Sequence, residues 1–197
     1  LSPCGGTMIY FVRHGQTQLG AEGRFQGCKE DCSLSELGEE QARRLQKGLP
    51  AFVPIFVSPM KRAQETAFLA APTATKMLLE ELRDVDVGPL GGKTREEVKS
   101  LFPEFYWRWL NHKVYVLPDG EQPASILSRA ERALALLPVA LDSIVVSHEG
   151  IIRFLLCKLL GLSWDFFPKL KIDEASISLV ADGQLIRLND TSHLREL

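Results

Sequence analysis

Cysteine is scarce in this chain, and its cysteines form no pattern that indicates a metal site or a disulfide framework. The four cysteines are scattered, contain no CxxC pair and have no histidines at zinc-finger spacing. Structural zinc sites need closely spaced ligands of these types. We therefore expect no bound metal and a reducing, cytoplasmic setting. The cysteines are Cys4, Cys28, Cys32 and Cys157.

Long apolar runs and an excess of charge of one sign are absent too. The apolar stretches fall far short of the about 20 residues that span a bilayer, and nothing resembles a secretory signal. The formal net charge of -2 gives no electrostatic footprint for nucleic acid or for an anionic membrane surface. We expect a small diffusing ligand as the partner, with no nucleic acid and no membrane.

The composition that remains is that of an ordinary globular domain, with 45% apolar and 24% charged residues. No internal repeat or low-complexity linker divides the chain. We therefore predict a single domain over residues 8–197. Residues 1–7, which precede Met8, are interpreted as a tag remnant or a short extension.

A short apolar run at residues 9–12 stops abruptly at Arg13-His14-Gly15. It predicts a buried strand that delivers polar groups to the carboxyl edge of a sheet, where open α/β sheets bind ligands. An imidazole can attack phosphorus, a guanidinium matches phosphate oxygens, and glycine permits a close approach of backbone to an anion. The triplet thus indicates phosphoryl chemistry, although taken alone it fits a strand that ends in a polar turn equally well.

Two further strand ends carry polar residues. An apolar run at 52–57 leads into a predicted helix at 60–71, with Pro59 at the first helical position and Arg62 in the first turn. Basic side chains gain nothing from the macrodipole there, so a nearby anion explains Arg62 better. A second run, at 143–147, ends at His148. Alternating strands and helices predict an α/β fold, a three-layer α/β/α sandwich with a central, mostly parallel sheet, which brings these ends together.

The rest of the chain supplies further predicted elements. Residues 19–33 are expected to be a loop over the site, and the aromatic, amphipathic segment at 102–116 to belong mainly to the core, with part of it able to wall a pocket. A hairpin is predicted from residues 175–180 and 185–188, and its exposure leaves open a homodimer. The remaining elements are a helix at 36–49, an edge strand at 76–82, a helix capped by Thr94, a helix at 124–141 and a buried helix at 151–160.

These motifs, taken together and in order, resemble the histidine phosphatase superfamily, which is also called the phosphoglycerate mutase-like family. The resemblance rests on Arg13-His14-Gly15-Gln16-Thr17, Gly23-Arg24-Phe25-Gln26-Gly27, Ser58-Pro59-Met60-Lys61-Arg62-Ala63 and Val146-Ser147-His148. It runs from Met8 to the tail. The tail at residues 188–194 is similar to the smaller bacterial branch that includes alpha-ribazole phosphatase and broad-specificity phosphatases.

The resemblance implies a role for each matched residue. His14 would be the nucleophile that becomes a phosphohistidine, and Arg13, Arg62 and His148 would form the phosphate pocket with it. Their charge would stabilise the transferring phosphoryl group without a metal or another cofactor. The matched positions that line the pocket in the family are Gln16, Thr17, Gln26 and Gly27.

The general acid is assigned by position. The matching family segment has a Glu four residues before a glycine, and here Asp84 stands four residues before Gly88. We assign Asp84 as the proton donor to the leaving oxygen and as the later base for water. Asp is one methylene shorter than Glu, so Glu81 and Asp86 remain as alternatives.

Some residues depart from the family pattern and bear on the substrate. Leu19-Gly20 stands where Trp-Asn is common, which removes an amide that would touch phosphate, and Leu90-Gly91 stands where Trp-Glu is usual. Glu149 replaces a usual glycine beside His148. This extra carboxylate would repel phosphate unless it faces away or meets a cationic group of the substrate, so Glu149 is a candidate binding residue.

The leading hypothesis is a phosphomonoester hydrolase that acts through a phosphohistidine on a small phosphorylated metabolite. Candidate substrates are alpha-ribazole phosphate and sugar phosphates. One alternative is a phosphoglycerate mutase, in which the phosphohistidine returns its phosphoryl group to another hydroxyl. Another, of a different class, is a non-catalytic protein that binds a phosphate ligand.

Overall fold

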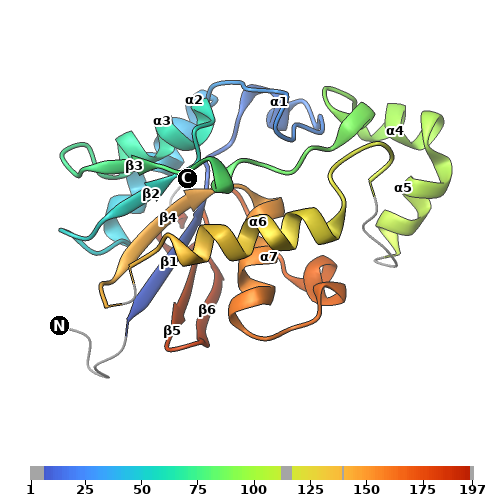
Figure 1. The fold of residues 1–197 in the computed structure, drawn as a ribbon. Helices are drawn as coiled ribbons and strands as arrows, with labels where there is room; N and C mark the ends of the chain where they lie inside the picture. Colours follow the sequence, from blue (N-terminus) through green and yellow to red (C-terminus); the bar gives the residue numbers. More distant parts are fainter. Residues whose placement is uncertain (1–6, 112–116, 139, 196–197) are drawn as a thin grey trace.

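The computed structural model describes residues 7–111, 117–138 and 140–195, and these residues build one six-stranded sheet (Figure 1). The strand order is β3-β2-β4-β1-β5-β6. The inner strands β2, β4 and β1 and the edge strand β3 run parallel, whereas β5 and β6 run antiparallel to their neighbours. The mostly parallel sheet is confirmed. Its strands are β1 (Met8–Arg13), β2 (Ile55–Val57), β3 (Lys76–Leu78), β4 (Ser143–Ser147), β5 (Ile177–Ala181) and β6 (Gln184–Asp190).

Helices lie on both faces of this sheet. The α-helices are α1 (Gln18–Ala21), α2 (Glu36–Arg44), α3 (Lys61–Ala70), α4 (Arg95–Leu101), α5 (Pro103–Leu110), α6 (Pro123–Ala135) and α7 (Glu149–Leu159). Short 3-10 helices occupy Leu45–Lys47, Glu80–Leu82, Gly88–Leu90, Trp164–Lys169 and Ser192–Leu194. No helix in these described ranges is both long enough and apolar enough to cross a membrane.

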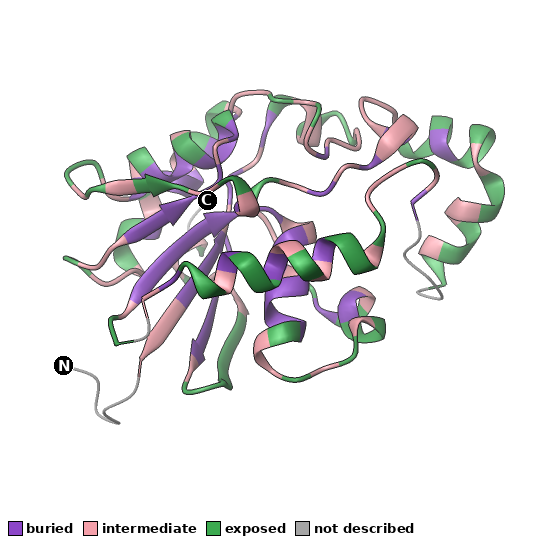
Figure 2. Ribbon diagram, in the orientation of Figure 1, coloured by how far each residue is buried: buried purple, intermediate pink, exposed green. Residues whose placement is uncertain are grey.

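The three layers follow from the two apolar faces of the inner strands. In β1, Phe11 belongs to the core on the side of α6 and α7, whereas Tyr10 and Val12 belong to the core on the side of α3. α2 packs beside α3. Figure 2 shows the inner strands buried between helices whose outer sides are exposed. The predicted three-layer α/β/α sandwich is therefore confirmed.

The pair α4–α5 lies apart from the sheet and is tied to the loop that follows β1 (Figure 1). Phe25 N donates to Lys93 O at 2.9 Å, and Gly92 N donates to Phe25 O at 2.8 Å. Thr94 begins α4 with a capping box that it forms with Glu97, as its position before two acidic residues predicts. These bonds join the aromatic segment to the loop, and that segment is described only as far as residue 111.

The strand and helix around residues 52–71 are shorter than the sequence predicts. Phe52 has a left-handed φ of 62° and a fully exposed side chain, and Pro54 has no N–H for the sheet, so β2 begins only at Ile55. Pro59 precedes the helix and is not its first residue. Met60 has extended backbone angles and is the N-cap, so α3 begins at Lys61.

Three further boundaries differ from the prediction. The loop at 19–33 overlaps the one-turn helix α1, which Thr17 caps by accepting a bond from Gly20 N. The strand expected at 76–82 ends at Leu78, and a 3-10 turn follows. The helix expected at 124–141 ends at Ala135, because Leu136 and Leu137 close a tighter turn before Pro138.

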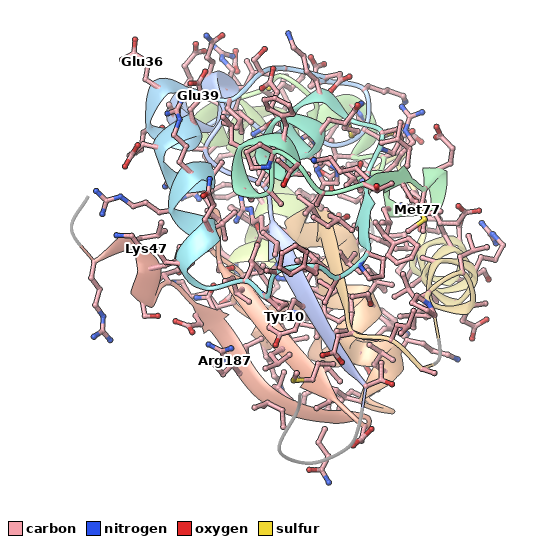
Figure 3. All side chains as sticks on the ribbon, turned by 90° about the vertical axis from the view of Figure 1, so that its left-hand side faces the viewer. Tyr10, Glu36, Glu39, Lys47, Met77 and Arg187 are labelled. Carbon is pink, nitrogen blue, oxygen red and sulfur yellow. The ribbon has the colours of Figure 1, made fainter. Side chains whose placement is uncertain are left out.

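The predicted hairpin is present as β5 and β6. Asp182 and Gly183 form its turn with left-handed φ values of 49° and 72°, the geometry that matches the twist of the strands. Residues 184–188 of the edge strand β6 are exposed. Arg187 is visible on this strand in Figure 3. The homodimer that such an edge leaves open stays a prediction.

Candidate active site

Three parallel strands end side by side and place the site at the carboxyl edge of the sheet. Arg13 pairs with Ser147 at the ends of β1 and β4, and His14 N donates to Ser147 O at 3.0 Å. At the end of β2, Ser58 N donates to Val146 O at 3.0 Å. The residues that follow these strands therefore share one crevice, although they are far apart in sequence.

His14 is held in one tautomer. Its side chain is buried, and Nδ1 lies 2.7 Å from Gly15 O, which can only accept a hydrogen bond. On the other side of the ring, Arg62 Nε donates to Nε2 at 3.2 Å. The hydrogen-bond network therefore assigns the proton to Nδ1 and leaves a lone pair on Nε2. This unprotonated nitrogen has the form that a nucleophile needs.

His148 is the N-cap residue of α7 and is also fully buried. Its Nε2 lies 2.8 Å from Ser58 Oγ, and its Nδ1 accepts a hydrogen bond of 3.2 Å from the same Arg62 Nε. The network thus assigns its proton to Nε2. The rings of His148 and His14 lie with centroids 5.1 Å apart. One guanidinium hydrogen is shared between the two imidazoles.

Both imidazoles are held neutral in the folded protein. Burial lowers the pKa of His14 well below its usual 6.5, and the charge of Arg62 lowers it further. Burial and then Arg62 likewise lower the pKa of His148 well below the same value. At neutral pH the ring of His14 therefore keeps its lone pair.

The side chain of Arg62 is buried completely, and all three nitrogens of its guanidinium group donate hydrogen bonds. Its Nη1 donates to Glu30 O at 2.8 Å, and its Nη2 donates to Gly27 O at 3.0 Å. Nη2 also lies 3.0 Å from Asp84 Oδ2. A guanidinium fixed on several sides stays in place when a negative ligand arrives, which is the preorganisation that electrostatic stabilisation requires.

Arg13 stands at the mouth of the same crevice. Its Nη1 donates to Ile172 O at 2.7 Å and lies 2.9 Å from Glu149 Oε2. Its Nε is buried and has no hydrogen-bond partner among the residues that the structure describes. Glu149 also pairs with Arg153 on the next turn of α7. The carboxylate of Glu149 is thus paired with two cationic side chains of the protein, Arg13 and Arg153.

Of the three candidate acids, the structure brings Asp84 to the site. Asp84 lines the cavity, with Oδ1 accepting from Val85 N at 2.9 Å and Oδ2 lying 3.7 Å from His148 Nδ1. Asp86 is paired with Lys29 at 2.9 Å. Neither Asp86 nor Glu81 is among the described residues that line the cavity.

The predicted pocket-lining residues divide into two pairs. Gln26 and Gly27 line the cavity. Gln16 accepts a hydrogen bond from Ser35 Oγ at 2.9 Å, and the Thr17 hydroxyl is occupied as the cap of α1. Neither Gln16 nor Thr17 is among the cavity-lining residues of the described ranges.

The cavity measures about 470 Å³ and extends well beyond the strand ends. Trp109 lines it, and its ring contacts Phe25 edge-on at 5.4 Å, so part of the aromatic segment walls a pocket. The expectation that the segment belongs mainly to the core is wrong, since no residue of α5 is buried. The motifs in the sequence do not point to five charged residues of this wall, which are Arg95, Arg153, Lys171, Asp173 and Glu174. For Arg153 a signal exists, because it follows Glu149 by one helical turn, a spacing that indicates an ion pair.

Metal ligands are not gathered at this site or elsewhere in the residues that the structure describes. Those residues contain no group of three or more His, Cys, Asp or Glu side chains that could hold an ion. The site is built from two neutral imidazoles, two guanidinium groups and a carboxylate. His14, Arg13 and Asp84 line the cavity, whereas Arg62 and His148 are not among its lining residues in the described ranges. Such a set can bind an anion and attack it.

Comparison with known proteins agrees with this architecture. Residues 9–185 match the family described as histidine phosphatase superfamily (branch 1). The chain is 32% identical over 201 residues to phosphoserine phosphatase 1 of Hydrogenobacter thermophilus, covering 95% of this chain and 94% of that protein. It is 30% identical over 169 residues to 2-carboxy-D-arabinitol-1-phosphatase of Triticum aestivum, covering 82% of this chain but only 34% of that protein.

A solved structure of a phosphatase has a similar fold. Phosphoserine phosphatase from Entamoeba histolytica, in complex with 3-phosphoglyceric acid, superposes with a TM-score of 0.80 at 25% identity and covers 95% of this chain and 99% of that one. Fold and site define an α/β protein with a histidine-containing anion site at the carboxyl edge of its sheet. The chain belongs to the histidine phosphatase superfamily, branch 1.

Proposed function

We propose that this protein is a phosphomonoester hydrolase that acts through a phosphohistidine formed on His14 Nε2. The observation that carries the proposal is the fixed tautomer of His14. Gly15 O holds the proton on Nδ1, so that Nε2 is unprotonated, and its lone pair accepts the hydrogen bond that Arg62 Nε shares with His148. Phosphatases among the relatives support this reaction class.

In the first step, His14 Nε2 forms a bond to phosphorus while the bond from phosphorus to the ester oxygen breaks. Arg13 and Arg62 stabilise the charge on the phosphoryl oxygens. His148 completes the pocket from the end of β4. Asp84, on the same side as Arg62 Nη2, supplies the proton that the leaving alkoxide needs.

In the second step, water attacks the phosphohistidine. The bond from phosphorus to Nε2 breaks, the proton of water passes to Asp84, and inorganic phosphate is released. Asp84 therefore returns to the protonated form in which it began. Positioning and fixed charge supply the catalysis in both steps.

The nucleophile is tested by replacing it. His14→Ala should lower turnover of p-nitrophenyl phosphate by about a thousandfold or more, because loss of a covalent nucleophile removes the reaction path. Wild type quenched at alkaline pH, where the P–N bond of phosphohistidine survives, should carry one phosphoryl group by mass, and the variant none. His193→Ala, which removes a histidine outside the cavity, is the matched control and should keep both properties. Equal activity of His14→Ala and wild type would remove the proposed nucleophile and favour a binding protein.

The mutase alternative makes a different prediction. With 3-phosphoglycerate and a bisphosphoglycerate primer, a hydrolase releases inorganic phosphate faster than it forms the isomer. Isomer formation that exceeds phosphate release would contradict the hydrolase. The substrate itself is tested with a panel of sugar phosphates, phosphoglycerates, nucleotides, phosphoserine and alpha-ribazole phosphate.

A further inference from the structure

The cavity wall beside Arg13 carries three carboxylates, and the protein neutralises only two of them. Glu149 pairs with Arg13 at 2.9 Å, and Asp173 pairs with Lys171 at 2.8 Å. Glu174 lines the same cavity and makes no ion pair with any residue that the structure describes. It is the one of the three whose charge has no cation of its own.

Glu174 reaches the cavity through space that Gly20 leaves free. A Cβ placed on Gly20 would lie 3.2 Å from Glu174 Oε1 and 3.3 Å from Gln26 Nε2. Both contacts are closer than ordinary packing, so a side chain at position 20 would push the carboxylate aside. Since Gly20, Gln26 and Glu174 all line the cavity, the carboxylate borders space that a ligand can enter.

The surroundings of Glu174 favour a cation. Burial raises the pKa of Glu174; the charge of Arg13 and a hydrogen bond from Gln16 lower it, and the weaker effects of Glu149 and Asp173 raise it. A half-buried carboxylate is stabilised strongly by a positive group that bonds to it directly. Lys171, the lysine of this wall, is already paired with Asp173.

We propose that Glu174 is a specificity-determining residue that binds an ammonium group on the leaving alcohol of the substrate. This inference rests on the proposed hydrolase function. Arg13, which would hold the phosphate, lines the same cavity as Glu174. A suitable substrate therefore carries its ammonium a few bonds from the phosphate, as in 2-aminoethyl phosphate. A neutral alcohol leaves the Glu174 charge uncompensated.

The test compares two substrates of nearly the same shape, 2-aminoethyl phosphate and n-propyl phosphate. Wild type should show the higher kcat/KM for the amine. Glu174→Gln retains an amide that can bond to Gln16 and should lower the ratio of the two values by about tenfold, the worth of one charge-assisted bond. Glu36→Gln removes a negative charge from the exposed outer side of α2 and should leave the ratio unchanged (Figure 3).

A second variant covers the case in which Glu174→Gln folds poorly, as judged by its thermal melt. Gly20→Ala places a Cβ 3.2 Å from Glu174 Oε1 and should reduce the preference for the amine while p-nitrophenyl phosphate is still hydrolysed. An unchanged ratio in an active Glu174→Gln enzyme would overturn the inference. So would an equal loss on both substrates, because it would place Glu174 in the chemistry rather than in recognition. Failure of the hydrolase itself would appear separately, as a wild type with no more activity than His14→Ala.

Discussion

At the scale of single residues, Asp84 forms an ion pair with Arg62 and is also the proton donor of the proposed reaction. Its Oδ2 lies 3.0 Å from Arg62 Nη2 in an ion pair, yet the proposed reaction needs a proton on the same carboxyl group. An arriving phosphate would take over part of the charge of Arg62. The ion pair would then weaken when the proton is needed.

Asp84→Asn should therefore matter most where the leaving group is poor. We expect a loss of about a hundredfold on an alkyl phosphate, because general acid catalysis is worth that much for a basic alkoxide. On p-nitrophenyl phosphate, whose leaving group needs no proton, the loss should be several times smaller. The measurement is kcat on both substrates.

Asp86→Asn is the matched control, since Asp86 is paired with Lys29 outside the cavity. It should leave both rates near those of wild type. Equal rates for Asp84→Asn and wild type on the alkyl phosphate would move the acid to Glu81 or Asp86.

The residues that sequence could locate are those at strand ends. Arg13, His14 and His148 follow buried strands, and parallel topology alone brings them together. Glu174 could not be located in this way. It depends on the absence of a side chain at Gly20, more than a hundred residues away in sequence, and on the absence of an ion pair to Glu174 among the described residues.

At the scale of elements, α2 holds the backbone that carries His14. A Cβ on Gly38 would lie 1.9 Å from Gln16 O, and one on Gly15 would lie 2.4 Å from Gly38 O. The helix and the loop after β1 therefore meet backbone to backbone. Neither side can move away, because both are packed into the sandwich.

Gly38→Ala should force this contact apart. We expect a loss of about 2 to 4 kcal/mol in the free energy of unfolding, because the obstacle is backbone rather than a flexible side chain. Activity should fall as well, since Gly15 O fixes the tautomer of His14. Denaturant unfolding and p-nitrophenyl phosphate hydrolysis measure the two effects.

Glu39→Ala, one residue further along the exposed side of α2, is the control (Figure 3). Only an exposed ion pair with Arg43 is lost there, so the change should stay within about 1 kcal/mol. A Gly38→Ala protein as stable as this control would refute the close contact.

The elements themselves were predictable where local patterns are strong. The run at 143–147 coincides with β4, because its β-branched residues Ile144, Val145 and Val146 favour a buried strand. The predicted boundaries of elements were wrong where the backbone conformation of a single residue ends the element. The left-handed turn at Phe52 shortens β2, and no propensity scale assigns a positive φ to a phenylalanine.

At the scale of the whole molecule, the neutral histidines make stability depend on pH. The pKa values of His14 and His148 lie below 6.5 in the folded chain, whereas the unfolded chain titrates near 6.5. The unfolded state thus binds more protons as pH falls below about 6.5. The stabilisation is complete above that pH and is lost as the pH approaches the folded pKa values.

The free energy of unfolding should consequently fall between pH 7 and about pH 5.5, by up to about 1.4 kcal/mol per pH unit for each buried histidine. Urea unfolding across this range measures the slope. Saturating inorganic phosphate is the control, because an anion in the pocket favours the imidazolium form and should flatten the slope. A flat profile without phosphate would contradict the buried, neutral pair.

The single hydrogen that Arg62 Nε offers to both imidazoles has one more consequence. A proton that arrives on either of the two facing nitrogens displaces that hydrogen and adds a positive charge beside the other ring. The second ring is then harder to protonate than the first. His14 and His148 should titrate in two separated steps that belong to the pair, and the ring signals of both histidines should shift at each step in an NMR titration.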